Sequence, residues 1–179
     1  MTDALPLTHS YNLARLGNAG DVVTFAADEA QREAIARWAG LLSLQRLDVT
    51  ATIKKLGPVR FGLDFKLGAD VTQACVVTLE PVPVKLDHSF HRELHFAGTA
   101  RHKPADESVP EVVLDSLEDE GPEEISSLHY DLAAPALEEY VLALEPYPRC
   151  PGVEFQPPTD GMPAKESPFA ALKGLKSGL

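Results

Sequence analysis

The stretch LDVTATIKKLGPVRFGLDFKL, residues 47–67, decides the fold of this chain. Apolar and polar side chains alternate through residues 47–54 and again through residues 59–67. A period of two is typical of a β-strand with one buried face and one face in water. Gly57-Pro58 separates the two runs and is a strong turn signal. We therefore expect an antiparallel hairpin at this point of the chain.

The same alternation continues on the C-terminal side of the hairpin. We expect a turn at Gly68–Asp70, a third strand over residues 71–79 and, after Pro81 and Pro83, a fourth over residues 84–96. A sheet this long usually curls or closes to protect its edges. The sequence therefore predicts an α+β fold: a curved antiparallel β-meander or partial barrel with two main helices packed on it.

The first helix is expected to begin after Asp28, with Gln31 as its capping-box partner, and to run to about Ala39. The second is expected from Leu132 to about Leu144, with Asp131 as its cap. The predicted buried positions are Ile35, Trp38, Ala39 and Leu42 in the first helix and Leu137, Val141 and Leu144 in the second. Short edge strands are expected at Thr8–Leu13 and Asp21–Phe25.

The negative charge of the chain is concentrated in one block. The net charge of the 179 residues is −11, yet residues 104–145 alone carry 13 acidic and no basic side chains. We expect one domain over residues 1–150, with a mobile acidic loop inserted at 104–127 that includes a short strand within 109–117. A Pro/Gly-rich tail follows over residues 151–179, with a short helical turn at Pro168–Leu172. Such a charge distribution repels bare phosphate backbones and attracts basic partners.

Several function classes lack support in the sequence. No apolar run approaches the ~20 residues of a membrane span, and Met1–Ser10 does not have the pattern of a signal peptide. Two cysteines do not make a disulfide framework, so we expect a cytoplasmic protein with reduced thiols. The chain has no nucleophile elbow, no P-loop and no dinucleotide-binding motif, and we expect no enzymatic activity.

Neither the histidines nor the cysteines predict a metal site or another cofactor. On a strand, His88 faces the apolar side while His91 and His95 face the other side, about 13 Å apart. That separation is too long for a shared zinc ion. Cys75 and Cys150 are too few for a tetrahedral site, whether or not they meet in space. We expect Cys75 to be a buried free thiol and Cys150 to be exposed.

Two sets of charged residues are candidate binding surfaces. The acidic set, a candidate site for a basic protein, comprises Asp106, Glu107, Glu111, Asp115, Glu118, Asp119, Glu120, Glu123 and Glu124. The basic set, a candidate RNA-facing surface on the polar side of the meander, comprises Lys54, Lys55, Arg60, Lys66, Lys85 and Arg92. Acidic side chains interleave with the basic set, which weakens the case for direct RNA contact.

Two motifs resemble those of a known family. Cys75 to Val82, with Leu79, Glu80 and Pro81, is similar to the C-x-x-C-L-E-P-V segment of the DUF177 or YceD family, also called large ribosomal RNA subunit accumulation protein. Thr78 stands where that pattern has its second cysteine, which puts a zinc role in doubt. The second motif is the helix over residues 131–144 and its exit at Pro146, Tyr147 and Pro148, and the ending at 168–173 resembles the alphaproteobacterial branch.

The resemblance implies a bacterial, non-enzymatic ribosome-biogenesis factor that supports accumulation of large-subunit (23S) ribosomal RNA. We expect the curved sheet to dock on a large-subunit precursor and the acidic set to bind a basic ribosomal protein. One alternative is an RNA-binding module that uses the basic set. Another is a thiol- or metal-binding protein that uses Cys75 and Cys150.

Overall fold

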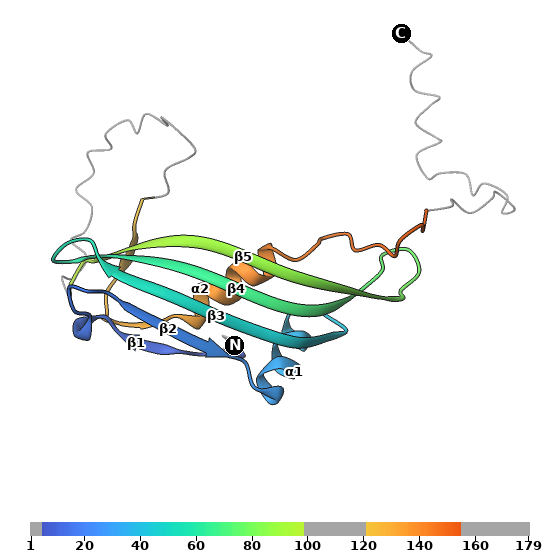
Figure 1. The fold of residues 1–179 in the computed structure, drawn as a ribbon, viewed down its shortest axis with the longest axis horizontal. Helices are drawn as coiled ribbons and strands as arrows, with labels where there is room; N and C mark the ends of the chain where they lie inside the picture. The colour runs from blue at the N-terminus through green and yellow to red at the C-terminus, as the bar shows by residue number, and fades with distance from the viewer. Residues whose placement is uncertain (1–4, 99–120, 155–179) are drawn as a thin grey trace, which may run out of the picture.

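The structure is a computed structural model, and it describes residues 5–98 and 121–154 of the chain. A five-stranded sheet has the order β2-β3-β4-β5-β6, and a small second sheet pairs β1 with β7 (Figure 1). The strands of the larger sheet are β2 (Asp21–Ala26), β3 (Ser43–Lys55), β4 (Arg60–Ala74), β5 (Pro81–Phe96) and β6 (Glu123–Ile125). The other elements are β1 (Ser10–Asn12), the 3-10 helix η1 (Leu13–Arg15), α1 (Glu29–Trp38), β7 (His129–Asp131) and α2 (Ala133–Leu142).

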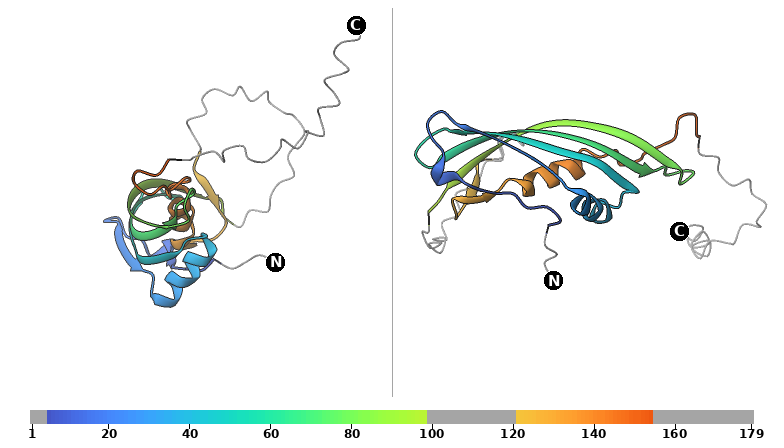
Figure 2. Two further views of the ribbon diagram at one scale, coloured as in Figure 1. Left: turned by 90° about the vertical axis from the view of Figure 1, so that its right-hand side faces the viewer. Right: turned by 60° about the horizontal axis from the view of Figure 1, so that its bottom comes forward.

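The predicted α+β class is confirmed, and the large sheet is curved and open. Figure 2 shows the long strands arching over α2, which lies along their concave side. Among the described residues the strand order is linear, with β2 and β6 at its two edges. All neighbours are antiparallel except β5 and β6, which are parallel. The sheet is therefore mixed, whereas the sequence predicted a purely antiparallel one.

The predicted turn at Gly68–Asp70 is wrong, because β4 continues through it from Arg60 to Ala74. Gly68 pairs with Asp48 on β3 and with Asp87 on β5. A Cβ atom at Gly68 would lie 3.0 Å from Nη1 of Arg46, whose guanidinium crosses the strand here. The glycine thus makes room for a side chain on the sheet surface, which is a common reason for glycine within a strand.

The chain turns instead at Cys75–Glu80. The Cys75 amide donates to the Glu80 carbonyl at 2.8 Å, and the Leu79 amide donates to the Cys75 carbonyl at 2.9 Å. β5 then begins at Pro81 and includes Pro83. Among the described residues, β5 pairs with β4 alone at both prolines, because β6 pairs with β5 at residues 94–96. An edge position does not need the amide hydrogen that proline lacks.

The hydrophobic core lies between the concave face of the sheet and α2. Alternate residues of the three long strands point into it, and α2 adds Ala136, Leu137 and Tyr140 from the other side. The buried strand residues include Leu47, Val49, Ala51, Ile53, Phe61, Leu63, Phe65, Leu67, Ala69, Val71 and Leu94. Full burial of such a side chain contributes about 1.5–3 kcal/mol, so this face holds α2 in place.

Helix α1 has the predicted capping box but not the whole predicted buried face. The Gln31 amide donates to Asp28 Oδ1 at 2.8 Å, and the Asp28 amide donates to Gln31 Oε1 at 2.9 Å. Ile35 and Ala36 are buried, whereas Trp38 is 44% exposed and Leu42 is 55% exposed. At ~100° per residue, Trp38 lies well to one side of the face centred on Ile35 and Ala36.

Helix α2 lies where the sequence predicted it, and its buried face also differs in part. The Ala133 amide donates to Asp131 Oδ1 at 3.0 Å, so Asp131 satisfies an amide of the first turn. Leu137 is buried as predicted, but Tyr140 is fully buried while Val141 is 38% exposed. Leu144, just beyond the helix, is partly buried against the core.

The acidic loop predicted over residues 104–127 is described only in its last part. Residues 123–125 form β6 rather than a loop, and they pair with residues 94–96 of β5. Residues 104–120, including the strand predicted within 109–117, lie outside the described residues, as does the helical turn predicted at 168–172. In residues 5–98 and 121–154, no helix is long and apolar enough to cross a membrane.

Candidate functional site

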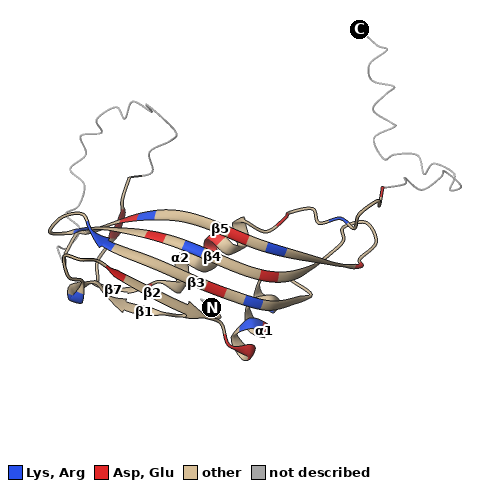
Figure 3. Ribbon diagram, in the orientation of Figure 1, with Lys and Arg blue, Asp and Glu red and all other residues tan. Residues whose placement is uncertain are grey.

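Most of the candidate RNA-facing residues lie on the convex face of the sheet. Figure 3 shows Lys and Arg interspersed with Asp and Glu along the long strands. Strand alternation places Lys54, Arg60, Lys66 and Lys85 there, and Lys55 lies exposed at the end of β3. Arg92 does not share this face. It pairs with Leu63 across the ladder, its guanidinium contacts α2, and its side chain is 27% exposed. The predicted basic surface is therefore smaller than expected.

The charges of the convex face balance. Arg46 bridges Asp48 and Asp70, Lys54 bridges Asp64, and Arg60 bridges Glu93. Lys55, Lys66 and Lys85 have no ion-pair partner within 4.0 Å in the part of the chain that the structure describes. The outward positions of β3, β4 and β5 hold five basic and five acidic side chains: Arg46, Lys54, Arg60, Lys66 and Lys85, and Asp48, Asp64, Asp70, Asp87 and Glu93.

Two carboxylates of this face titrate below the usual range of aspartate. The hydrogen bond from His91, with help from Lys54, lowers the pKa of Asp64. The hydrogen bond from Arg46 lowers the pKa of Asp70. Both aspartates therefore stay charged at neutral pH, and the face presents balanced pairs rather than a uniform positive field.

Arg92 belongs to a polar cluster between the sheet and α2. Its Nη2 lies 3.0 Å from Glu139 Oε1 and 3.6 Å from Glu138 Oε2. His88 Nε2 lies 3.2 Å from the other oxygen of Glu139. The buried stripe predicted for this helix, Leu137, Val141 and Leu144, does not include Glu138 or Glu139. Their pairing with β5 depends on how α2 crosses the sheet, which periodicity does not give.

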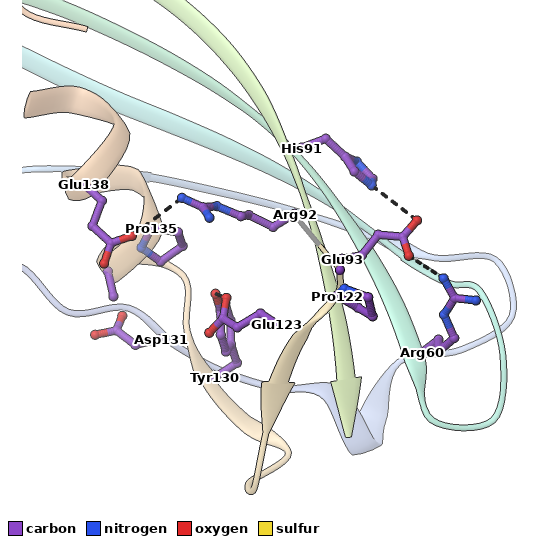
Figure 4. A pocket seen from close by; sticks show the side chains of 12 residues that line it. Arg60, His91, Arg92, Glu93, Pro122, Glu123, Tyr130, Asp131, Pro135 and Glu138 are labelled. Carbon is purple, nitrogen blue, oxygen red and sulfur yellow. Dashed lines mark hydrogen bonds and ion pairs between the residues drawn. The ribbon is translucent and has the colours of Figure 1, made fainter. Parts of the chain in front are cut away.

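Seven of the nine acidic candidates, Asp106 to Glu120, lie outside the described residues; Glu123 and Glu124 lie on β6. Beside them, a hollow of about 890 Å³ opens between the ends of β4 and β5, β6, β7 and α2 (Figure 4). Arg60 and Arg92 line it together with a larger number of carboxylates: Glu93, Glu123, Asp131 and Glu138. The hollow therefore suits a positively charged group.

Tyr130 lies in the wall of this hollow and donates a hydrogen bond from its hydroxyl to Glu123 Oε2 at 3.1 Å. Burial and the neighbouring Glu123 raise the pKa of Tyr130 above the ordinary value for tyrosine. The hydroxyl thus stays protonated at physiological pH and keeps the Glu123 carboxylate in a fixed orientation.

The two family-like motifs meet in space, although they are far apart in sequence. The Val76 amide donates to the Pro148 carbonyl at 2.9 Å, and the Cys150 amide donates to Cys75 Sγ at 3.4 Å. Cys75 is fully buried as predicted, whereas Cys150 is half-buried rather than exposed. Thr78 joins this cluster, with its Oγ1 3.8 Å from Cys150 Sγ.

The thiol of Cys75 is unusually acidic. Hydrogen bonds from the Thr78 hydroxyl and from nearby backbone amides lower its pKa to about 6. Burial raises the pKa of Cys150 above its ordinary value. Two further motif residues beside this cluster are exposed, Leu79 by 76% and Tyr147 by 69%.

No three His, Cys, Asp or Glu side chains among the described residues are arranged to hold a metal ion. His88 contacts α2 on the concave side, and His91 contacts Asp64 on the convex side. The histidines thus face opposite ways, as the alternation predicted.

Comparison with known proteins gives one family and no individual relative. Neither the search of curated proteins nor that of solved structures finds a match to this chain. The family model of the large ribosomal RNA subunit accumulation protein YceD matches residues 63–176, which include both motifs and the acidic block. The chain belongs to the YceD family, and a role in ribosome biogenesis fits that family.

Proposed function

We propose that this protein is a non-enzymatic, cytoplasmic assembly factor that supports accumulation of large-subunit ribosomal RNA by binding a basic ribosomal protein or a precursor particle that contains one. The family supplies the ribosomal context. The choice of a basic partner rests on the charge of residues 121–145. This segment has six carboxylates and no Lys or Arg. A basic ribosomal protein complements that charge.

The hollow beside β6 is the described surface best suited to such a partner. Its wall has two arginines and four carboxylates, so a lysine or arginine side chain entering it meets an excess of negative charge. The convex face offers no comparable attraction for RNA, because its five basic and five acidic side chains cancel. RNA binding depends on releasing counterions from several phosphates, which a neutral face does poorly.

The first experiment measures ribosomes in cells that lack the protein. A sucrose-gradient profile, with the ratio of large-subunit to small-subunit ribosomal RNA, should show a specific shortfall of the large-subunit RNA. A normal ratio in those cells would contradict the assembly role itself.

A second experiment tests the partner. The double variant Glu123→Gln/Glu124→Gln should weaken co-sedimentation of the protein with large-subunit precursors, and replacing all nine acidic candidates should weaken it further. The matched control, Glu29→Gln/Glu33→Gln, removes the same charge from α1, away from β6 (Figure 1). Equal loss in both double variants would mean that only net charge matters.

A third experiment tests direct RNA contact by removing basic side chains from the convex face of the sheet. Lys66→Ala/Lys85→Ala, which removes two cations of the convex face outside the wall of the hollow, should leave co-sedimentation unchanged under this proposal. Loss of association in that variant, together with a steep salt dependence, would favour the RNA-binding alternative instead.

A further inference from the structure

The end of the sheet at which β4 turns into β5 holds both cysteines of the chain. The Cys150 amide nitrogen lies 3.4 Å from Cys75 Sγ. Because the Cα atom is about 1.5 Å from that nitrogen, Cys150 Cα lies within about 5 Å of the Cys75 sulfur. Cysteines joined by a disulfide have Cα atoms about 4.4–6.8 Å apart. A cysteine sulfur lies about 3 Å from its own Cα atom, so the two Cα atoms are within about 8 Å of each other, a bound that includes this range. The Cys75 thiol also acts directly on the Cys150 thiol, so the two sulfurs can meet by rotation of the side chains.

The surroundings of the two sulfurs differ in a way that assigns them different roles. Cys75 is fully buried, and the amides of Val77, Thr78 and Cys150 point to its sulfur. Such a ring of backbone amides stabilises a thiolate. Cys150 is partly open to solvent, and the Thr78 hydroxyl contacts its sulfur at 3.8 Å. One thiol is thus reachable from solvent, and the other is stabilised as an internal nucleophile.

We propose that Cys75 and Cys150 are a modification site, at which a low-molecular-weight disulfide of the glutathione disulfide class converts the two thiols into an intramolecular disulfide. This inference does not depend on the proposed function. Thr78, which replaces the second cysteine of the family-like motif, takes part in the proposed site. Its hydroxyl contacts the sulfurs of both Cys75 and Cys150.

The chemistry balances in two exchange steps. First, the Cys150 thiol loses its proton to solvent and attacks one sulfur of the small disulfide, releasing one small thiolate and leaving a mixed disulfide on Cys150. Second, the Cys75 thiolate attacks Cys150 Sγ and expels the second small thiolate. The protein loses two electrons and two protons, and the small disulfide is reduced to two thiols.

The product would join the β4–β5 turn to the segment that follows α2. The two cysteines are 75 positions apart, so the bond closes a long loop and restricts the unfolded chain. We expect the oxidised protein to unfold at a temperature on the order of 5–10 °C higher than the reduced protein.

The test treats the full chain with glutathione disulfide under native conditions and follows its intact mass. The expected product has lost the mass of two hydrogen atoms, and a non-reducing peptide map should join the peptides that contain Cys75 and Cys150. The chain has no other cysteine, so no other intramolecular disulfide can form.

Three variants test the role of each side chain in the two exchange steps. Cys75→Ser should accumulate the mixed disulfide on Cys150, because the internal nucleophile is gone. Cys150→Ser should remain unmodified while folded, because Cys75 is fully buried. Thr78→Val keeps the shape of the side chain and removes its hydroxyl, so the disulfide should form several-fold more slowly at pH 7, even if the cysteine variants fold poorly.

Three results would overturn the proposal. One is a mixed disulfide that persists on Cys150 in the wild-type chain. Another is a product that contains only disulfide-linked dimers. The third is stoichiometric zinc in the purified protein that is released when the thiols are blocked, since the cysteines would then be metal ligands.

Discussion

Arg92 on β5 and Glu139 on α2 form the polar link between the sheet and its helix. Nη2 of Arg92 lies 3.0 Å from Oε1 of Glu139, and their side chains are only 27% and 21% exposed. His88 contacts the second oxygen of the same carboxylate. The pair lies on the concave face, where the neighbouring positions of the long strands are apolar.

Replacing Arg92 by Met should therefore destabilise the protein. The methionine keeps most of the apolar stem but leaves Glu139 half-buried without its main cation. Loss of one member of a fully buried pair costs about 3–5 kcal/mol, and partial exposure reduces this to roughly 1–3 kcal/mol. The measurement is urea unfolding of the purified chain.

The control is Arg60→Met, which breaks the pair with Glu93 on the convex face. That pair is more exposed, at 52% and 34%, so the variant should change the free energy of unfolding by less than about 1 kcal/mol. Equal effects of the two variants would contradict a special role for the Arg92–Glu139 pair.

Removing the hydroxyl of Tyr140 should stabilise the protein. This hydroxyl is buried and has no hydrogen-bond partner among the described residues, and burial raises the pKa of Tyr140. A buried unsatisfied polar group costs about 1–3 kcal/mol, so Tyr140→Phe should raise the urea midpoint. Tyr130→Phe is the matched comparison and should lower it, because that hydroxyl donates to Glu123. A lower midpoint for Tyr140→Phe would reveal a partner for its hydroxyl.

Replacing the exposed residue Leu79 by glycine should stabilise the protein. The φ of Leu79 is +62°, in the left-handed region that disfavours residues with a Cβ atom, and the residue is 76% exposed. Leu79→Gly should raise the free energy of unfolding by about 1 kcal/mol, measured in urea. Val76, exposed in the same turn, has no positive φ, so Val76→Gly should lower it. Destabilisation in both variants would mean that the leucine side chain packs usefully.

The stability of the convex face should depend on pH through Asp64. Folding lowers the pKa of this carboxyl, chiefly through the hydrogen bond from His91. The interaction therefore stabilises the fold above the ordinary titration range of aspartate, and the contribution disappears as the pH falls through the lowered pKa. Urea unfolding between neutral pH and pH 3 should lose more stability in the wild type than in Asp64→Asn. Parallel curves for the two proteins would contradict this assignment.

The sequence was a good guide to which face of a strand each residue occupies. Alternation correctly assigned Leu63 and Phe65 to the core and His91 to the outer face. It failed at Gly68, because a glycine that makes room for Arg46 looks the same in sequence as one that turns the chain. A glycine in the sequence indicates that the position does not tolerate a larger side chain. It does not indicate whether a turn of the backbone or a nearby side chain is the cause.

The site was less predictable, because its contacts join distant parts of the chain. Cys75 and Cys150 meet across 75 positions, and Arg92 meets Glu139 across 47. Each contact depends on where α2 crosses the sheet. The sequence did reveal the acidic block, since charge composition does not depend on the fold.

The pairing of β1 with β7 sets an order on folding during synthesis. Residues 10–12 pair with residues 129–131, and the His9 amide donates to Asp131 Oδ1 across 122 positions. The β3–β4 and β4–β5 hairpins close over short turns and can form while the chain is still growing. The first strand, by contrast, must wait until Asp131 has left the exit tunnel. The beginning of this protein is therefore among the last parts to find its place in the native structure.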